Sequence, residues 1–184
     1  MTGSPTGRLL LTPEDGQGAE RAERLRALGL LERAEPDFDR FAEHLAVAHS
    51  APWAMVNFLD AERQFLAGLH WPSARAGAAA SLDVFAQRSL GRDHGYCPHV
   101  VVRRRALALE DVRDYPRFAQ NPVVDGFGVR SYLGAPLLDR SGLALGTVCV
   151  LDVAPRRWGG QGLAVIKAMA AELTERILSR DHGI

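Results

Sequence analysis

Residues 129–151 read VRSYLGAPLLDRSGLALGTVCVL, and this stretch supplies two strands around which the rest of the chain can be arranged. Its second half, 143–151, is almost continuously apolar, which is typical of a buried central strand. The first half is also rich in strand-forming residues but contains Pro136, so that strand must bend or lie at an edge there. Asp139 to Gly142 between them form a polar turn, with a glycine available for positive φ.

Further strands are predicted on both sides of this pair along the sequence. Residues 53–59 (WAMVNFL) and 63–69 (RQFLAGL) flank a short polar turn and predict a hairpin. Residues 106–109 (ALAL) predict one more strand. The proline-punctuated segment 114–125 reads as a polar loop.

Helical periodicity surrounds the predicted strands. One helix carries Leu25, Leu28 and Leu31 on one face, and a last helix is expected over 161–179. A second helix begins at Pro36, with Phe38, Phe41, Leu45 and Ala48 facing inward and Asp37, Asp39 and Glu43 outward. A short helix containing Leu82 and Phe85 is expected to end at Gly91. This order predicts an α+β domain with one antiparallel sheet covered on one side.

Composition narrows the class of protein. The chain has 184 residues and no net charge, with 22 basic and 22 acidic side chains, which argues against nucleic acid or an anionic membrane surface as the main partner. No run approaches the roughly 18 apolar residues of a membrane span, and the start lacks a secretory signal, so we expect a cytoplasmic protein. Residues 1–19 read as a flexible tail and 20–180 as a single domain.

Four strings in a fixed order carry a family resemblance. They are RLRALGLLERAEPDFDRFAEHLA (24–46), YCPHVV (96–101), EDVRDYPRFAQNP (110–122) and RSYLGAPLLDRSGLALGTVCVLDVAPRRW (130–158). Together they resemble the GAF domain family of bacterial sensory modules, over roughly residues 22–179. The likeness is to the GAF domains found beside kinase or PPM-type phosphatase domains in actinobacterial regulators. The resemblance implies a GAF/PAS-like (profilin-like) fold, with a central antiparallel sheet of five or six strands and flanking helices. We expect no cofactor.

The resemblance also implies a ligand site between the sheet and the segments that cover it. Alternation along the strand places Arg130, Tyr132 and Gly134 on one face. Asn57 interrupts an apolar strand and therefore needs a polar partner. The predicted ligand-binding residues are Asn57, Tyr96, Cys97, His99, Asp111, Arg117, Phe118, Arg130 and Tyr132. For Asp111, Asp114, Arg117 and Asn121 the alternative is that they only hold their loop together.

The two cysteines leave several interpretations open. Cys97 is either a reactive thiol or a small buried residue, whereas Cys149, inside an apolar run, reads as structural. A disulfide between them requires Cα atoms within about 7 Å. Pro98 separates Cys97 from His99, unlike the adjacent Cys-His pair of GAF domains that attach a bilin. No histidine, cysteine or carboxylate set has convincing metal-ligand spacing.

The leading hypothesis is a non-catalytic sensory domain that binds a small molecule or a partner domain. It requires a cavity between the sheet and the segment after Gly91. One alternative is a thiol-based redox sensor or an enzyme like the free methionine sulfoxide reductases, using Cys97. Another is an interaction scaffold with a degenerate pocket. We also expect a homodimer through residues 20–31 and 163–178, unless these helices only cover their own sheet, and a separate kinase or phosphatase as output protein.

Overall fold

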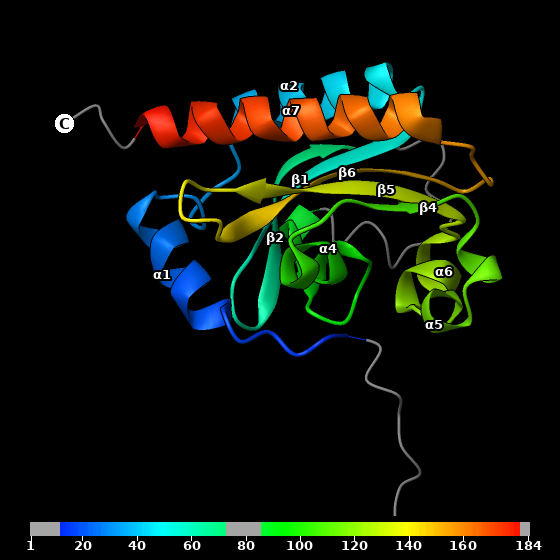
Figure 1. Ribbon diagram of the computed structural model, residues 1–184, viewed down its shortest axis with the longest axis horizontal. Coiled ribbons are helices and arrows are strands. Elements are labelled where there is room, and N and C mark those ends of the chain that lie inside the picture. Colours follow the sequence, from blue (N-terminus) through cyan, green and yellow to red (C-terminus); the bar gives the residue numbers. More distant parts are fainter. Residues whose placement is uncertain (1–11, 73–85, 181–184) are drawn as a thin grey trace, which may run out of the picture.

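A computed structural model describes residues 12–72 and 86–180 (Figure 1). The chain forms a layered α+β domain around one sheet. In chain order its elements are α1 (Gly18–Ala27), α2 (Pro36–Ala48), β1 (Trp53–Leu59), β2 (Arg63–His70), β3 (Ser89–Gly91), α4 (Cys97–Arg103), β4 (Leu107–Leu109), a 3-10 turn (Val112–Asp114), α5 (Pro116–Ala119), α6 (Pro122–Phe127), β5 (Ser131–Leu138), β6 (Ala144–Asp152) and α7 (Gly159–Ser179).

The sheet has six strands in the order β3-β2-β1-β6-β5-β4, and every neighbouring pair is antiparallel. Strand β6 is buried along its whole length and lies in the middle, which confirms the prediction from its apolar sequence. Strand β4 pairs only with residues 132–134 of β5. Pro136 therefore lies beyond the end of β4, where a missing backbone donor breaks no ladder on that side.

Helices cover both faces of the sheet, so the expectation of a single covered face is wrong. In Figure 1, α2 and α7 lie above the sheet, and α4, α5 and α6 lie below it. Successive residues of β1 enter different cores: Val56 and Phe58 pack under α2 and α7, and Met55 and Leu59 pack above α4. A strand whose two faces are both apolar needs a cover on each side.

Local details differ from the sequence-based expectations. Residues 89–91 form strand β3, so no helix ends at Gly91; Leu82 and Phe85 lie outside the described residues. In α2, Ala48 is exposed, and Asp39 turns toward the sheet edge to accept hydrogen bonds from Leu69 N and Arg88. The segment 114–125 contains the short helices α5 and α6 instead of a plain loop.

A buried arginine attaches the segment before α1 to the sheet. Arg21 is 1% exposed, donates from Nε to the Ala144 carbonyl at 2.8 Å and pairs with Asp15 at 2.6 Å. Arg92 donates to the Pro13 carbonyl at 2.6 Å. The described part of the expected tail, from residue 12, is thus bonded to the domain. Within residues 12–72 and 86–180, no helix has the length and apolarity that crossing a bilayer requires.

Candidate functional site

Glycine at position 134 shapes the lower face of the sheet. Gly134 pairs across strands with Cys149, and a Cβ placed on it would overlap the Tyr132 hydroxyl. The phenol ring of Tyr132 therefore lies along its own strand, over the space that a side chain at 134 would fill. This confirms that Tyr132 and Gly134 share one face, as the alternation of β5 predicts.

The Tyr132 hydroxyl points at a pair of buried thiols. Cys97 is the first residue of α4, and its Sγ lies 3.3 Å from the Tyr132 hydroxyl and 3.8 Å from Sγ of Cys149. Both cysteines are free, and they are 3% and 0% exposed. Two thiols in contact, one at a helix start and one in the central strand, form a site that can lose protons or electrons as a unit.

The surroundings shift the pKa values of Cys97, Cys149 and Tyr132 in different directions. Hydrogen bonding with Cys149 lowers the pKa of Cys97, and burial opposes this shift. The side chains of Thr147, Tyr132 and Asn57 act in the same direction as Cys149. The same contact, together with burial, raises the pKa of Cys149. Burial also raises the pKa of Tyr132. Cys97 is therefore the group of this cluster that ionises first.

Polar atoms of β1 and β6 border the thiol pair. Asn57 pairs across strands with Thr147, and its Nδ2 donates to Gln64 Oε1 at 2.7 Å. Gln64 in turn donates to the carbonyls of Gly91 and His94. Among the described residues, however, neither Asn57 Oδ1 nor Thr147 Oγ1 has a partner at hydrogen-bond distance and angle, although both atoms are buried and Thr147 interacts with the Cys97 thiol. Leaving such an atom unpaired costs about 1–3 kcal/mol.

Aromatic side chains fill the layer between the sheet and the lower helices. Tyr96 packs edge-on against Phe118 and Tyr132, with ring centroids 5.5 Å and 5.3 Å apart, and its hydroxyl donates to the Phe118 carbonyl. Among the described residues, the cavity found in this layer measures only about 30 Å³ and is lined by Met55, Trp71, Leu90, Val123, Phe127, Val129 and Leu151. The expected guest-sized cavity is thus occupied by the protein's own side chains in this conformation.

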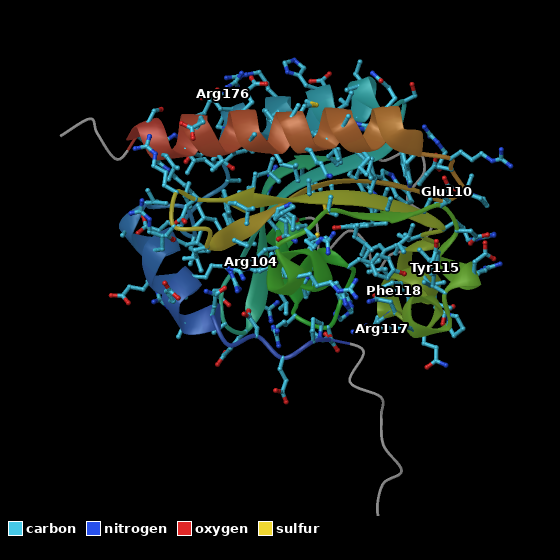
Figure 2. All side chains as sticks on the ribbon, viewed as in Figure 1. Arg104, Glu110, Tyr115, Arg117, Phe118 and Arg176 are labelled. Carbon is cyan, nitrogen blue, oxygen red and sulfur yellow. The ribbon has the colours of Figure 1, made fainter. Side chains whose placement is uncertain are left out.

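The structure brings six of the nine predicted site residues together and leaves three apart. The six lie in or against the lower core: Asn57, Tyr96, Cys97, His99, Phe118 and Tyr132. Asp111 instead forms an ion pair with Arg130 at 2.5 Å and accepts from Arg113 N, which fixes the turn after β4. Arg117 is exposed and lies over the Phe118 ring, on the lower helices in Figure 2.

Sequence reasoning missed two members of the cluster. It took Cys149 as structural and did not consider Thr147, yet both face the lower layer. Their spacing could have revealed this: Thr147 and Cys149 are two positions apart in a strand, so their side chains lie on the same face of β6. The long-range pairing that sets Cys149 beside Cys97 could not be read from spacing. Among the residues that the structure describes, no three His, Cys, Asp or Glu side chains form a metal-binding group.

The antiparallel sheet between two layers of helices makes this an α+β protein with a polar cluster enclosed beneath the sheet. The GAF domain family matches residues 35–177, and the chain belongs to this family. The match confirms the resemblance seen in the four strings and the predicted α+β architecture.

Individual relatives add context. Over 133 residues the chain is 35% identical to a cyclic di-GMP phosphodiesterase of Pseudomonas aeruginosa; the match covers 70% of this chain and 20% of that relative. The GAF domain of a phosphoenolpyruvate-protein phosphotransferase from Coxiella burnetii has a similar fold (TM-score 0.63, 16% identity, 89% of this chain and 94% of that one). The free methionine-R-sulfoxide reductase of Neisseria meningitidis also has a similar fold (TM-score 0.61, 14% identity, 94% of this chain and 97% of that one covered).

Proposed function

We propose that this chain is a regulatory GAF domain whose lower layer opens to accept a small ligand or a group of a partner protein. The observation that carries this proposal is the pair of buried, unpartnered oxygens, Asn57 Oδ1 and Thr147 Oγ1, beside the thiols. An incoming polar group would satisfy them and thereby favour the open arrangement. A ligand shifts an equilibrium only through such differential affinity.

The layer that would move is built from short elements. Helices α4, α5 and α6 have seven, four and six residues, and helices of this length depend on tertiary packing for their stability. Asn121 holds two of them in place: its side chain exchanges hydrogen bonds with the Gly95 backbone and accepts from Val123 N. A local opening of this layer has to break these bonds.

Two threonine substitutions test whether the site holds unused hydrogen-bonding capacity. Thr147→Val removes a buried hydroxyl that has no partner, so we expect the free energy of unfolding to rise by about 1–3 kcal/mol. The control Thr174→Val removes a hydroxyl that donates to the Ala170 carbonyl at 2.9 Å and should not stabilise. Urea unfolding gives both values. A Thr147→Val protein less stable than the parent would contradict the proposal.

The Pseudomonas relative supports a signalling role. A matched segment that makes up 20% of a phosphodiesterase corresponds to one part of a larger signalling enzyme. On this basis we propose a cytoplasmic domain that controls an output protein such as a kinase or phosphatase. The same proposal includes the homodimer through residues 20–31 and 163–178. The scaffold alternative would apply if no ligand raised the unfolding temperature of the parent chain in a screen.

A second candidate function rests on the 3.8 Å contact between the thiols of Cys97 and Cys149. In a thiol-based sensor, a hydroperoxide would take up the electrons: the Cys97 thiolate attacks the peroxide oxygen and releases water or an alcohol, giving a sulfenic acid. Cys149 then displaces water from the sulfenic sulfur, forming the disulfide. The product would fasten the start of α4 to the central strand β6.

Peroxide treatment tests this candidate. We expect the parent chain to lose two hydrogens by intact mass and both alkylatable thiols after denaturation, with recovery by dithiothreitol. Cys149→Ser should retain a sulfenic acid that a dimedone probe labels, because no resolving thiol remains. If the parent chain keeps both thiols under conditions that oxidise glutathione, the sensor idea is wrong.

A reductase activity would use the same pair differently. Reduction of a sulfoxide by two thiols yields a thioether, a disulfide and water, so the atoms balance without another reactant. Both thiols, however, are at most 3% exposed, and neither lines the cavity of about 30 Å³ in the lower layer, so free methionine sulfoxide has less access to them than a small hydroperoxide. We therefore rank this activity below the sensor, and assaying free methionine-R-sulfoxide as substrate distinguishes the two.

A further inference from the structure

A groove outside the thiol cluster runs along the unpaired part of strand β5. Because β4 pairs only with residues 132–134, the edge of β5 from Ala135 to Leu138 has no strand beside it among the described residues. Helix α7 forms one wall of the resulting groove, and the connection between α4 and β4 forms the other. The groove has a volume of about 500 Å³, within the range of small-molecule sites.

Three cationic side chains line this groove: Arg104 and Arg105 after α4, and Lys167 on α7. The lining contains no carboxylate, and none of the three cations forms an ion pair with a residue that the structure describes. The neighbouring groove between α2 and α7 differs, since its arginines Arg40, Arg176 and Arg180 each have a carboxylate partner. A chain of zero net charge thus keeps three unneutralised cations at one place.

The backbone at Arg104 is costly for a residue of this kind. Arg104 ends α4 in the left-handed conformation, with φ 52° and ψ 36°, which glycine adopts at much lower cost. A contact between the Arg104 guanidinium and a bound anion would offset the energy cost of this backbone conformation. Figure 2 places Arg104 at the end of α4, beneath the sheet.

We propose that this groove binds a phosphorylated small molecule of nucleotide size. Arginine and lysine side chains bind phosphate oxygens through charge-assisted hydrogen bonds, and the two arginines can do so bidentately. The floor, formed by Pro136, Leu138 and Leu163, suits a ring or a chain. Pro136 lacks a backbone donor, which disfavours an acidic peptide added as a strand. The site shares no side chain with the thiol cluster, so it is independent of the function proposed for that cluster.

Isothermal titration calorimetry with ATP and with inorganic pyrophosphate tests the proposal, with adenosine as the uncharged comparison. We expect the intact chain to bind at least one of the two phosphate compounds more tightly than adenosine, and less tightly as salt increases. Arg105→Gln with Lys167→Gln should weaken binding at least about tenfold, since two charge-assisted hydrogen bonds to phosphate are lost. Arg26→Gln, an exposed arginine on α1, should leave the affinity unchanged.

Arg104→Gly separates binding from folding. Glycine relieves the left-handed backbone, so the unfolding temperature should stay level or rise while the affinity falls. The proposal is overturned if neither phosphate compound binds, or if binding is the same in the double variant as in the parent. Binding of an oligoglutamate peptide that ATP fails to displace would also overturn it, in favour of an acidic protein segment.

Discussion

At the scale of single residues, the site depends on where side chains are missing as much as on where they are present. Gly134 leaves the space that the Tyr132 ring occupies, and this brings the phenol hydroxyl within 3.3 Å of Cys97. The backbone of Gly146 approaches the Asn57 carbonyl so closely that no side chain fits there either. Both glycines lie within strands that are paired on both sides, where glycine weakens a sheet unless close packing requires it.

Gly134→Ala tests this packing. The added methyl group would overlap the Tyr132 hydroxyl, so the ring must move, and we expect a loss of about 1–3 kcal/mol from overpacking. Chemical denaturation measures the effect. In Gly126→Ala the methyl group meets no atom within 4 Å, so this variant should be as stable as the parent or slightly more so. Equal stability of the two variants would show that Tyr132 is not held over Gly134.

At the scale of elements, the lower layer is fixed at its outer end by a salt bridge. Asp111 accepts from Arg130, the residue before β5, and this ion pair lowers the pKa of Asp111. Because the folded-state pKa is depressed, the bridge stabilises the protein above the unfolded carboxyl pKa of about 3.9. That contribution is lost as the pH falls through the folded-state value.

The variant Asp111→Asn should therefore be less stable than the parent at pH 7, with the difference shrinking toward pH 3. Urea unfolding at both pH values measures it. Glu62→Gln, in the exposed turn between β1 and β2, serves as control and should show no such pH-dependent difference. A difference of the same size at pH 3 and pH 7 would mean that the charge of Asp111 is not what stabilises the turn.

At the scale of the whole molecule, helices α1 and α7 bury their apolar faces in the core of their own chain. Leu25 of α1 and Ile166, Leu173 and Ile177 of α7 are at most 3% exposed. Any homodimer must therefore use the outer surfaces of these helices. Deleting residues 20–31 is a poor test of dimerisation, because the deletion also removes Arg21 and Leu25 from the interior.

Light scattering on the full chain measures the dimer directly. If α7 contributes to the interface, Ala168→Glu on its exposed side should convert the dimer to a monomer without lowering the unfolding temperature, because the substitution alters only the outer surface. Glu43→Gln on the exposed side of α2 is the control and should leave the mass unchanged. A parent chain that is monomeric at all concentrations would contradict the dimer prediction.

Local patterns in the sequence were enough to predict five of the six strands, the main helices, the central place of β6 and the family resemblance, because apolar periodicity and turn residues act over short distances; β3 was missed. Six of the nine residues predicted to bind a ligand lie together in or against the lower core. Three features came from the packing of distant segments: helices cover both faces of the sheet, Tyr96, Phe118 and Tyr132 fill the lower layer, and Cys149 contacts Cys97. The physical reason is that contacts between residues 52 positions apart depend on strand register and helix packing, which local patterns do not encode.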